Sequence, residues 1–147
     1  MATGSRAADP FRGFKFRVQI DGITKAGFRE VSGLDAGTDA VDYRDGDGTT
    51  IRKLAGLQKF SNITLKRGIT DDKDIWKWRT MVMDGKIKDA RKNGQIILLD
   101  DEGKEAAEWT FTDGWPTKWT GPAFNATANE VAIDTLEIVH EGLKRVK

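Results

Sequence analysis

Apolar and polar side chains alternate along the first part of the chain. The alternation from 14 to 20 has the period of two that is typical of a strand with one buried face, and Asp21-Gly22 after it is a turn signal. A weaker strand is predicted from 25 to 34, where glycines interrupt the pattern. The chain is therefore expected to open with two strands, the first of them half-buried.

Segment 35–56 is rich in Gly, Asp and Thr and has few large apolar side chains. Within it, the Asp-Gly-Asp-Gly run at 45–48 is a tight-turn signal between two short extended pieces, 40–44 and 49–53. We predict an extended hairpin over 35–56. Because its apolar content is too low to bury much surface by itself, we expect it to pack on a neighbour.

A strand is predicted over 60–69, and its side chains alternate between two faces. One face comprises Ile63, Leu65 and Arg67, so it is apolar except for the basic residue at its end. The other face is polar throughout, and it comprises Asn62, Thr64 and Lys66. Such a strand has one face for a core and another that meets either water or a second subunit.

A helix is predicted over 72–84, with Thr70 or Asp71 as its cap and Gly85 as its end. Apolar residues fall on one stripe at helical spacing, namely Ile75, Trp78 and Val82. We expect this stripe to lie across a sheet.

Two further strands are predicted over 87–99 and 109–119, joined by a turn at 100–103. Residues 96–99 are apolar on both faces, which indicates a central strand. Pro116 should end the pairing or lie at a sheet edge, because proline cannot donate to the ladder.

The last predicted strand, 129–141, changes the phase of its apolar residues, which predicts a bulge near 134–135. Together the elements predict a mainly β fold, a β-sandwich or open barrel of about seven or eight strands with one packed α-helix and an extended β-hairpin. We expect a single domain over 1–147, with a flexible arm at 1–10.

Charge and composition exclude several classes of protein. The 24 basic and 23 acidic residues leave a net charge of +1, which argues against a general nucleic-acid binder. The absence of cysteine excludes disulfides and thiolate metal sites. No apolar run approaches the length of a membrane span, and the first ten residues lack the apolar segment of a secretory signal. We therefore expect the protein to be made soluble in the cytoplasm and to remain there, unless a larger assembly carries it out.

Residues that could carry catalysis or bind a ligand are few. His140 is the only histidine, so neither a histidine-based triad nor a multi-histidine metal site can form. Asp45 and its neighbours loosely resemble a calcium loop, but its twelfth position is Gly56 instead of Glu. Trp119 is the one tryptophan that we expect to be exposed, and core packing suits the others better. We predict no enzyme activity, no cofactor and no metal.

Nine short segments, in order along nearly the whole chain, resemble the phage tail tube family, and in particular the inner-tube subunits of phage-tail-like contractile injection systems. They are residues 9–11 with 14–22, then 26–34, 43–46, 52–57, 62–70, 76–78, 115–118, 129–134 and 140–143. Ala55 departs from the family pattern, which has proline there, and its effect should be local stiffness of the chain.

The resemblance implies a structural subunit that forms hexameric rings, stacked into a hollow tube inside a contractile sheath. It also implies sheath, baseplate or initiator, and terminator partners, with cargo able to travel in the lumen and the particle able to leave the cell. The hairpin and arm would bridge copies, with the contact residues Tyr43, Asp45, Asp47, Arg52, Lys53 and Lys59. The lumen-facing candidates are Asn62, Thr64 and Lys66.

Two other interpretations stay open at this stage. One is a close relative, the tube of a type VI secretion apparatus or of a true phage tail. The other is a monomeric β-sandwich module that binds carbohydrate through Trp119 and the glycine loops.

Overall fold

The computed structural model describes residues 15–23, 27–46, 48–127 and 131–147, so the predicted arm at 1–10 lies outside the described residues. The described part contains nine strands and two helices. The strands are β1 (Phe16–Ile20), β2 (Glu30–Ser32), β3 (Ala36–Tyr43), β4 (Arg52–Phe60), β5 (Ile63–Gly68), β6 (Lys92–Leu99), β7 (Glu105–Thr120), β8 (Ile133–Val139) and β9 (Gly142–Arg145). The helices are α1 (Asp74–Met83) and α2 (Ile87–Ala90). The predicted mainly β fold with a packed helix and an extended hairpin is confirmed.

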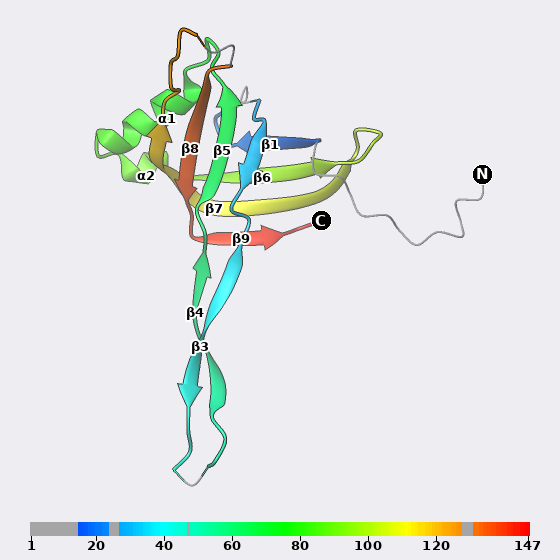
Figure 1. Ribbon diagram of the computed structural model, residues 1–147, viewed down its shortest axis with the longest axis vertical. Coiled ribbons are helices and arrows are strands. Elements are labelled where there is room, and N and C mark those ends of the chain that lie inside the picture. The colour runs from blue at the N-terminus through cyan, green and yellow to red at the C-terminus, as the bar shows by residue number, and fades with distance from the viewer. Residues whose placement is uncertain (1–14, 24–26, 47, 128–130) are drawn as a thin grey trace, which may run out of the picture.

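One strongly curved antiparallel sheet forms the body, in the order β1-β6-β7-β8-β5-β2, with β9 paired to β7. In Figure 1, β5 and β8 run along the long axis while β1, β6 and β9 cross it, so the sheet folds into two layers. β6 is a central strand, as its apolar residues predicted, because it pairs with both β1 and β7. The core lies between the layers and includes Val18, Ile20, Ile63, Leu65, Ile96, Phe111, Leu136 and Ile138.

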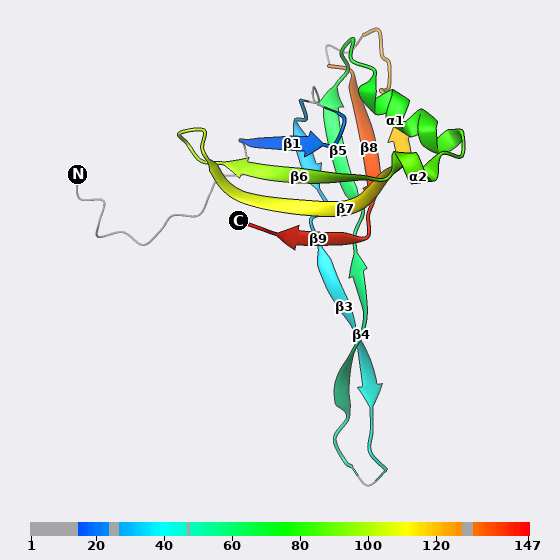
Figure 2. The ribbon, with the colours of Figure 1, turned by 180° about the vertical axis from the view of Figure 1, so that it is seen from behind.

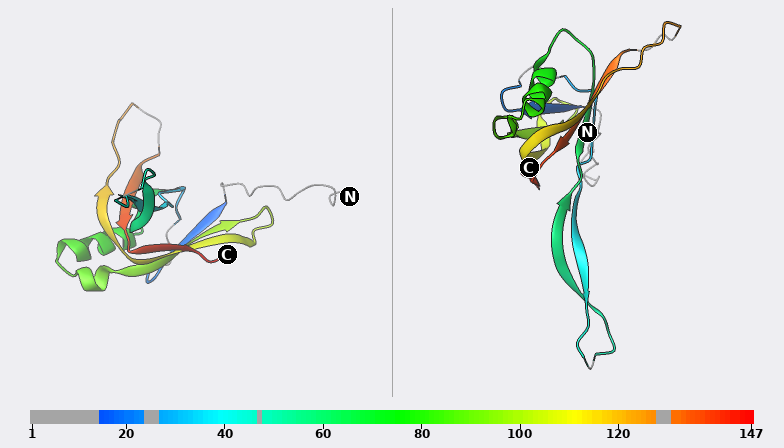
Figure 3. Two further views of the ribbon diagram at one scale, coloured as in Figure 1. Left: turned by 90° about the horizontal axis from the view of Figure 1, so that it is seen from below. Right: turned by 90° about the vertical axis from the view of Figure 1, so that its left-hand side faces the viewer.

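Strand β7 belongs to both layers because it bends in its middle, as the curved yellow ribbon of Figure 3 shows. Its first part pairs with β6 and β9, and from Trp115 onward it pairs with β8. At the bend Asp113 has a φ of 51°. Gly114 follows, and a Cβ there would lie 2.5 Å from the Phe111 ring, so only glycine fits.

Pro116 does not end the pairing of β7, but β7 pairs there with β8 alone, so the predicted edge position is confirmed. It is buried inside the strand opposite Ile138, and the register shifts between Pro116 and Lys118. A bulge is one of the few sheet positions that tolerate proline, because the local ladder is already interrupted there.

The strand predicted over 60–69 is shorter than expected, since β5 begins at Ile63 and Phe60 belongs to β4. The extended conformation is interrupted between β4 and β5. At this point Gly33, with a φ of 90°, lies against the backbone of Asn62. A Cβ on Gly33 would overlap the Asn62 carbonyl, so this close crossing requires glycine.

Helix α1 starts later than predicted, and a second helix replaces the start of a predicted strand. The N-cap residue of α1 is Lys73, and Asp72 Oδ1 accepts the Asp74 N–H at 2.9 Å. Residues 87–90, predicted as strand, form α2 instead. Trp78 Nε1 donates to the Ala90 carbonyl at 2.6 Å, and both residues are buried. The short helix α2 therefore places the Ala90 carbonyl beside the Trp78 indole. The local sequence pattern does not reveal this contact.

The bulge predicted near 134–135 is absent from β8. This strand pairs with β5 in unbroken register from Gly68 opposite Ile133 to Ile63 opposite Ile138. Asp134 occupies an inward position, followed by the buried Leu136. The apparent change of phase thus came from a charged residue inside the body.

Strands β3 and β4 form a separate two-stranded hairpin that projects far from the body (Figures 1 and 2). It pairs from Ala36 opposite Phe60 to Tyr43 opposite Arg52, so it reaches further toward the C-terminus than the predicted 35–56. No residue of either strand is buried. The hairpin therefore contributes nothing to the core of the body.

Candidate functional site

The hairpin has two unlike faces, because directly opposite residues of an antiparallel pair share a face. On one face Asp42 and Lys53 are opposite each other and form a close ion pair. On the other face Val41 is opposite Leu54, and Tyr43 lies beside them. These three apolar side chains are 47–49% exposed. An apolar face on a two-stranded ribbon has no core of its own to cover it.

The three basic residues predicted as contacts are each paired within the hairpin. Lys53 pairs with Asp42, Lys59 Nζ lies 3.1 Å from Asp39, and Arg52 Nε lies 3.8 Å from Asp45. The predicted basic lead-in is therefore not a net positive surface. Exposed pairs of this kind contribute little stability, about 0–1 kcal/mol each. Sequence reasoning missed the pairing because it depends on the register of the strands.

The hairpin tip is closed by one backbone hydrogen bond and one side-chain hydrogen bond. The Gly48 N–H donates to the Asp45 carbonyl at 2.9 Å, and Arg44 Nε donates to the Gly48 carbonyl at 3.1 Å. The predicted contact residue Asp47 lies outside the described residues.

Two of the lumen candidates, Thr64 and Lys66, lie on the face of β5 that points away from the core, and Asn62 directly precedes this strand. Asn62 donates to Glu137 at 3.2 Å, and Lys66 Nζ lies 3.8 Å from Glu30. Thr64 is opposite Glu137 on β8 and Ser32 on β2. The predicted alternation of β5 is thus observed, with Ile63 and Leu65 buried. The polar face continues onto the neighbouring strands, which suits contact with water.

His140 joins the base of the hairpin to the body. Its Nε2 lies 3.1 Å from the Ser61 carbonyl and its Nδ1 lies 3.1 Å from the Gly142 carbonyl. The ring also packs against Phe60, at the end of β4, and against Phe111 in the core. This histidine has a structural role at the hairpin joint.

Replacement of His140 with alanine should lower the free energy of unfolding by about 1–2 kcal/mol, since a hydrogen bond to an exposed or half-buried carbonyl and two ring contacts disappear. Urea unfolding followed by tryptophan fluorescence measures this change. His140→Phe is the matched control, because it keeps a ring between Phe60 and Phe111 but removes the ring nitrogens that contact the two carbonyls. Equal stability of the wild type and both variants would contradict the assigned role.

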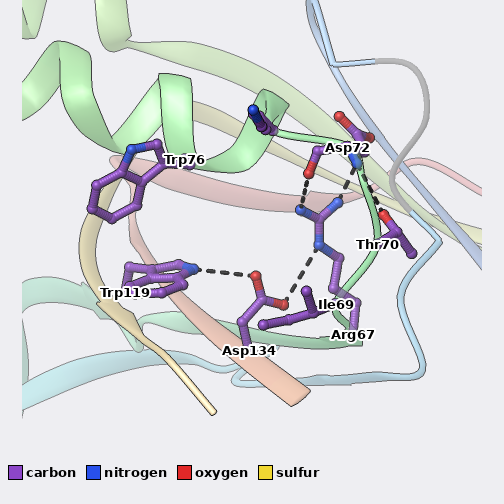
Figure 4. Close-up of a pocket in the computed structure, with 8 residues that line it drawn as sticks. Arg67, Ile69, Thr70, Asp72, Trp76, Trp119 and Asp134 are labelled. Atoms are coloured by element: carbon purple, nitrogen blue, oxygen red, sulfur yellow. Dashed lines mark hydrogen bonds and ion pairs between the residues drawn. The ribbon is translucent and has the colours of Figure 1, made fainter. Parts of the chain in front are cut away.

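A cavity of about 300 Å³ lies where β5, β7, β8 and the start of α1 meet (Figure 4). Its walls include Ile69, Trp76 and Trp119, and the two indoles meet edge to face with centroids 5.0 Å apart. Both expectations about these rings are wrong: Trp76, expected in the core, is 47% exposed, and Trp119, expected to be exposed, is half-buried against the core.

The inner end of the cavity is a buried ion network. Arg67, only 5% exposed, has its Nε 3.5 Å from Asp134 and its Nη1 3.7 Å from Asp72. Trp119 Nε1 donates to Asp134 Oδ2 at 3.2 Å. Sequence reasoning missed this network, although two charged residues at inward strand positions were a signal for it.

Among the described residues, no group of three or more His, Cys, Asp or Glu side chains is arranged to hold a metal ion. Within the same part of the chain, no helix has the length and apolar character that a bilayer crossing requires.

The sequence from 12 to 144 matches the family model of the T4-like virus tail tube protein gp19. The chain belongs to this tail tube family. No curated protein matches the chain.

The tail tube fold recurs in solved structures. A chain of the PVC sheath-tube complex, from an extracellular contractile injection system in its extended state, is 27% identical with a TM-score of 0.81, and the match covers 99% of this chain and 97% of that one. A chain of the anti-feeding prophage tube-terminating cap is 27% identical with a TM-score of 0.80, covering 99% and 98%. Hcp1 from Flavobacterium johnsoniae is 16% identical with a TM-score of 0.56, covering 89% and 94%, and shares the fold alone.

Proposed function

We propose that this tail tube protein is the subunit of the hollow inner tube of a contractile injection apparatus. The observation that carries the proposal is the likeness to a chain of an extracellular sheath-tube complex over 99% of the present chain. In this proposal the whole chain acts as one tail tube domain. Copies form hexameric rings, the rings stack inside a sheath, and the lumen conducts cargo.

The proposed partners follow from the assemblies in which similar chains occur. Those assemblies are a sheath-tube complex, a baseplate, a tube-terminating cap and a sheath/tube terminator. We infer sheath, baseplate or initiator, and terminator proteins as partners here, and a role that is structural rather than catalytic. The subunit would be made in the cytoplasm and leave the cell as part of the particle.

An injection system suits the chain better than a type VI secretion tube. Identity to the injection-system chains reaches 27% with TM-scores near 0.8, whereas the Hcp structures reach 16% and 0.56. A monomeric carbohydrate-binding module is disfavoured, because it would leave the apolar face of the hairpin permanently in water.

The hairpin is the proposed contact between copies. Its apolar face, formed by Val41, Tyr43 and Leu54, needs a cover that the described part of the subunit does not supply. Arg52, Lys53, Lys59 and Asp45 would exchange some of their internal pairs for pairs with another copy, which preserves charge balance. Asn62, Thr64 and Lys66 would line the lumen, because a water-filled channel requires a polar wall.

Electron microscopy of the purified protein tests the proposal. We expect rings or tubes with six-fold symmetry, and a chain that stays monomeric at high concentration in every condition would contradict it. Deletion of residues 45–48 should spare the fold, checked by circular dichroism, yet stop stacking. A second variant, in which residues 45–48 are replaced by four Gly and Ser residues, keeps the length of the hairpin but removes the side-chain contacts of the tip. Tubes of normal length in the deletion variant would refute the role of the tip.

A further inference from the structure

The aromatic cavity and the hairpin tip lie at opposite ends of the molecule. In Figure 1, β4 and β5 follow one another along the long axis, with the hairpin at one end. The cavity residues Ile69 and Thr70 come directly after the far end of β5. Copies stacked head to tail along this axis would therefore bring the tip of one toward the cavity of the next.

The cavity has the chemistry of a socket for one aromatic side chain. Its volume of about 300 Å³ is at the lower limit of small-molecule pockets. Ile69, Trp76 and Trp119 supply an apolar wall, and Figure 4 shows the two indoles together on one side of the pocket. The charged groups deeper inside form ion pairs with one another. Aromatic anchors in such pockets dominate the affinity of many protein interfaces.

Tyr43 is the side chain that matches this socket. It is the only tyrosine of the chain, it lies at the tip end of β3, and it is 47% exposed. A tyrosine combines a large apolar ring with a polar end, which suits a pocket with apolar walls and charged surroundings. Charges also complement each other: Asp45 is two residues beyond Tyr43, and the exposed Lys73 lines the cavity.

We propose that the Trp76–Trp119 cavity receives Tyr43 from the hairpin of a second copy, with Asp45 of that copy near Lys73. This rests on the proposed function as a stacking tube subunit and specifies the site at which successive copies meet. The contact is heterologous, because tip and socket are different surfaces. Such contacts propagate into open stacks, and a filamentous tube requires this property along its axis.

Cross-linking tests the contact directly, because the chain contains no cysteine. Ile51, at the tip and 54% exposed, and Lys73 are both changed to cysteine in one chain, which is then treated with a short bifunctional maleimide. We expect a ladder of covalent oligomers. The matched control is Ile51→Cys with Met83→Cys, because Met83 is 53% exposed at the other end of α1, about 15 Å from Lys73 along the helix. A ladder from both pairs, or from neither, would overturn the proposal.

Substitutions in the socket give an independent readout. Trp76→Ala should reduce the assembled fraction in sedimentation by about tenfold or more, as truncation of an interface anchor does. Tyr43→Ala should do the same, whereas Met83→Ala on the same helix as Trp76 should assemble normally. Normal assembly of Trp76→Ala would refute the socket and leave the tube function intact. Failure of the unmodified chain to assemble would overturn both.

Discussion

Replacement of Arg67 with methionine is expected to destabilise the protein by about 3–5 kcal/mol, because it leaves buried carboxylates without their cation. Arg67 is 5% exposed, and its guanidinium faces Asp134 and Asp72 and also donates to the Asp72 carbonyl at 3.2 Å. The side chain therefore ties β5 to β8 and to the start of α1. Chemical denaturation followed by fluorescence measures the loss.

Lys66→Met is the matched control for Arg67→Met, since the two residues are adjacent on β5 and point to opposite faces. Its pair with Glu30 spans 3.8 Å between partly exposed side chains, so its loss should cost no more than about 1 kcal/mol. A double variant that also changes Asp134 to leucine should recover part of the loss, because one carboxylate no longer lacks a partner. Equal effects of the two methionine variants would show that the buried network is not what stabilises this end of the sheet.

The same residues show what the sequence could and could not predict. Period-two patterning is enough to predict both faces of β5, because each face has one environment along the whole strand. It misreads β8, because Asp134 occupies an inward position and makes the pattern appear to slip. The charge is tolerated there only because Arg67 is opposite it on β5, and that pairing depends on long-range register. Taken together, the two charged residues at inward positions, Arg67 and Asp134, indicate an ion pair between β5 and β8 instead of a bulge in β8.

Local sequence patterns could not predict helix α2 or the full length of β7. Residues 87–90 have enough apolar character for a strand, and only the buried indole of Trp78 accounts for a helical turn there. Pro116 stays within β7 because the strand pairs there with β8 alone and its register shifts after Pro116. Only for α2 does a tertiary contact override a local preference.

The candidate site divides in the same way. The turn signal at 45–48 was sufficient to predict a hairpin, since turn chemistry is local. Neither the internal pairing of Lys53 and Lys59 nor the apolar face that includes Tyr43 could be seen without the register of β3 on β4. The cavity could not be predicted from the sequence either. Its two tryptophans are far apart in sequence and come together only when α1 packs beside the end of β7.

Substitution of Gly94 by alanine is expected to destabilise the body by about 1–3 kcal/mol or more through overpacking. Gly94 is opposite Phe111 in the β6–β7 register, and a Cβ at Gly94 would overlap the fully buried Phe111 ring. Gly114 lies against the other edge of the same ring, where a Cβ would come within 2.5 Å of Phe111 Cε1. The ring therefore has no room to move away, and thermal unfolding should show a lower midpoint.

Rescue distinguishes a steric cause from a general loss of order. Phe111→Leu in the Gly94→Ala background should restore part of the lost stability, because the smaller side chain vacates the space that the new methyl group needs, giving an interaction energy that a double-mutant cycle measures. Gly46→Ala is the control, because a Cβ there meets no atom within 4 Å, and its effect should stay within about 0.5 kcal/mol. If Gly94→Ala were as stable as Gly46→Ala, the close packing of Phe111 between two glycines would not be a constraint on this fold.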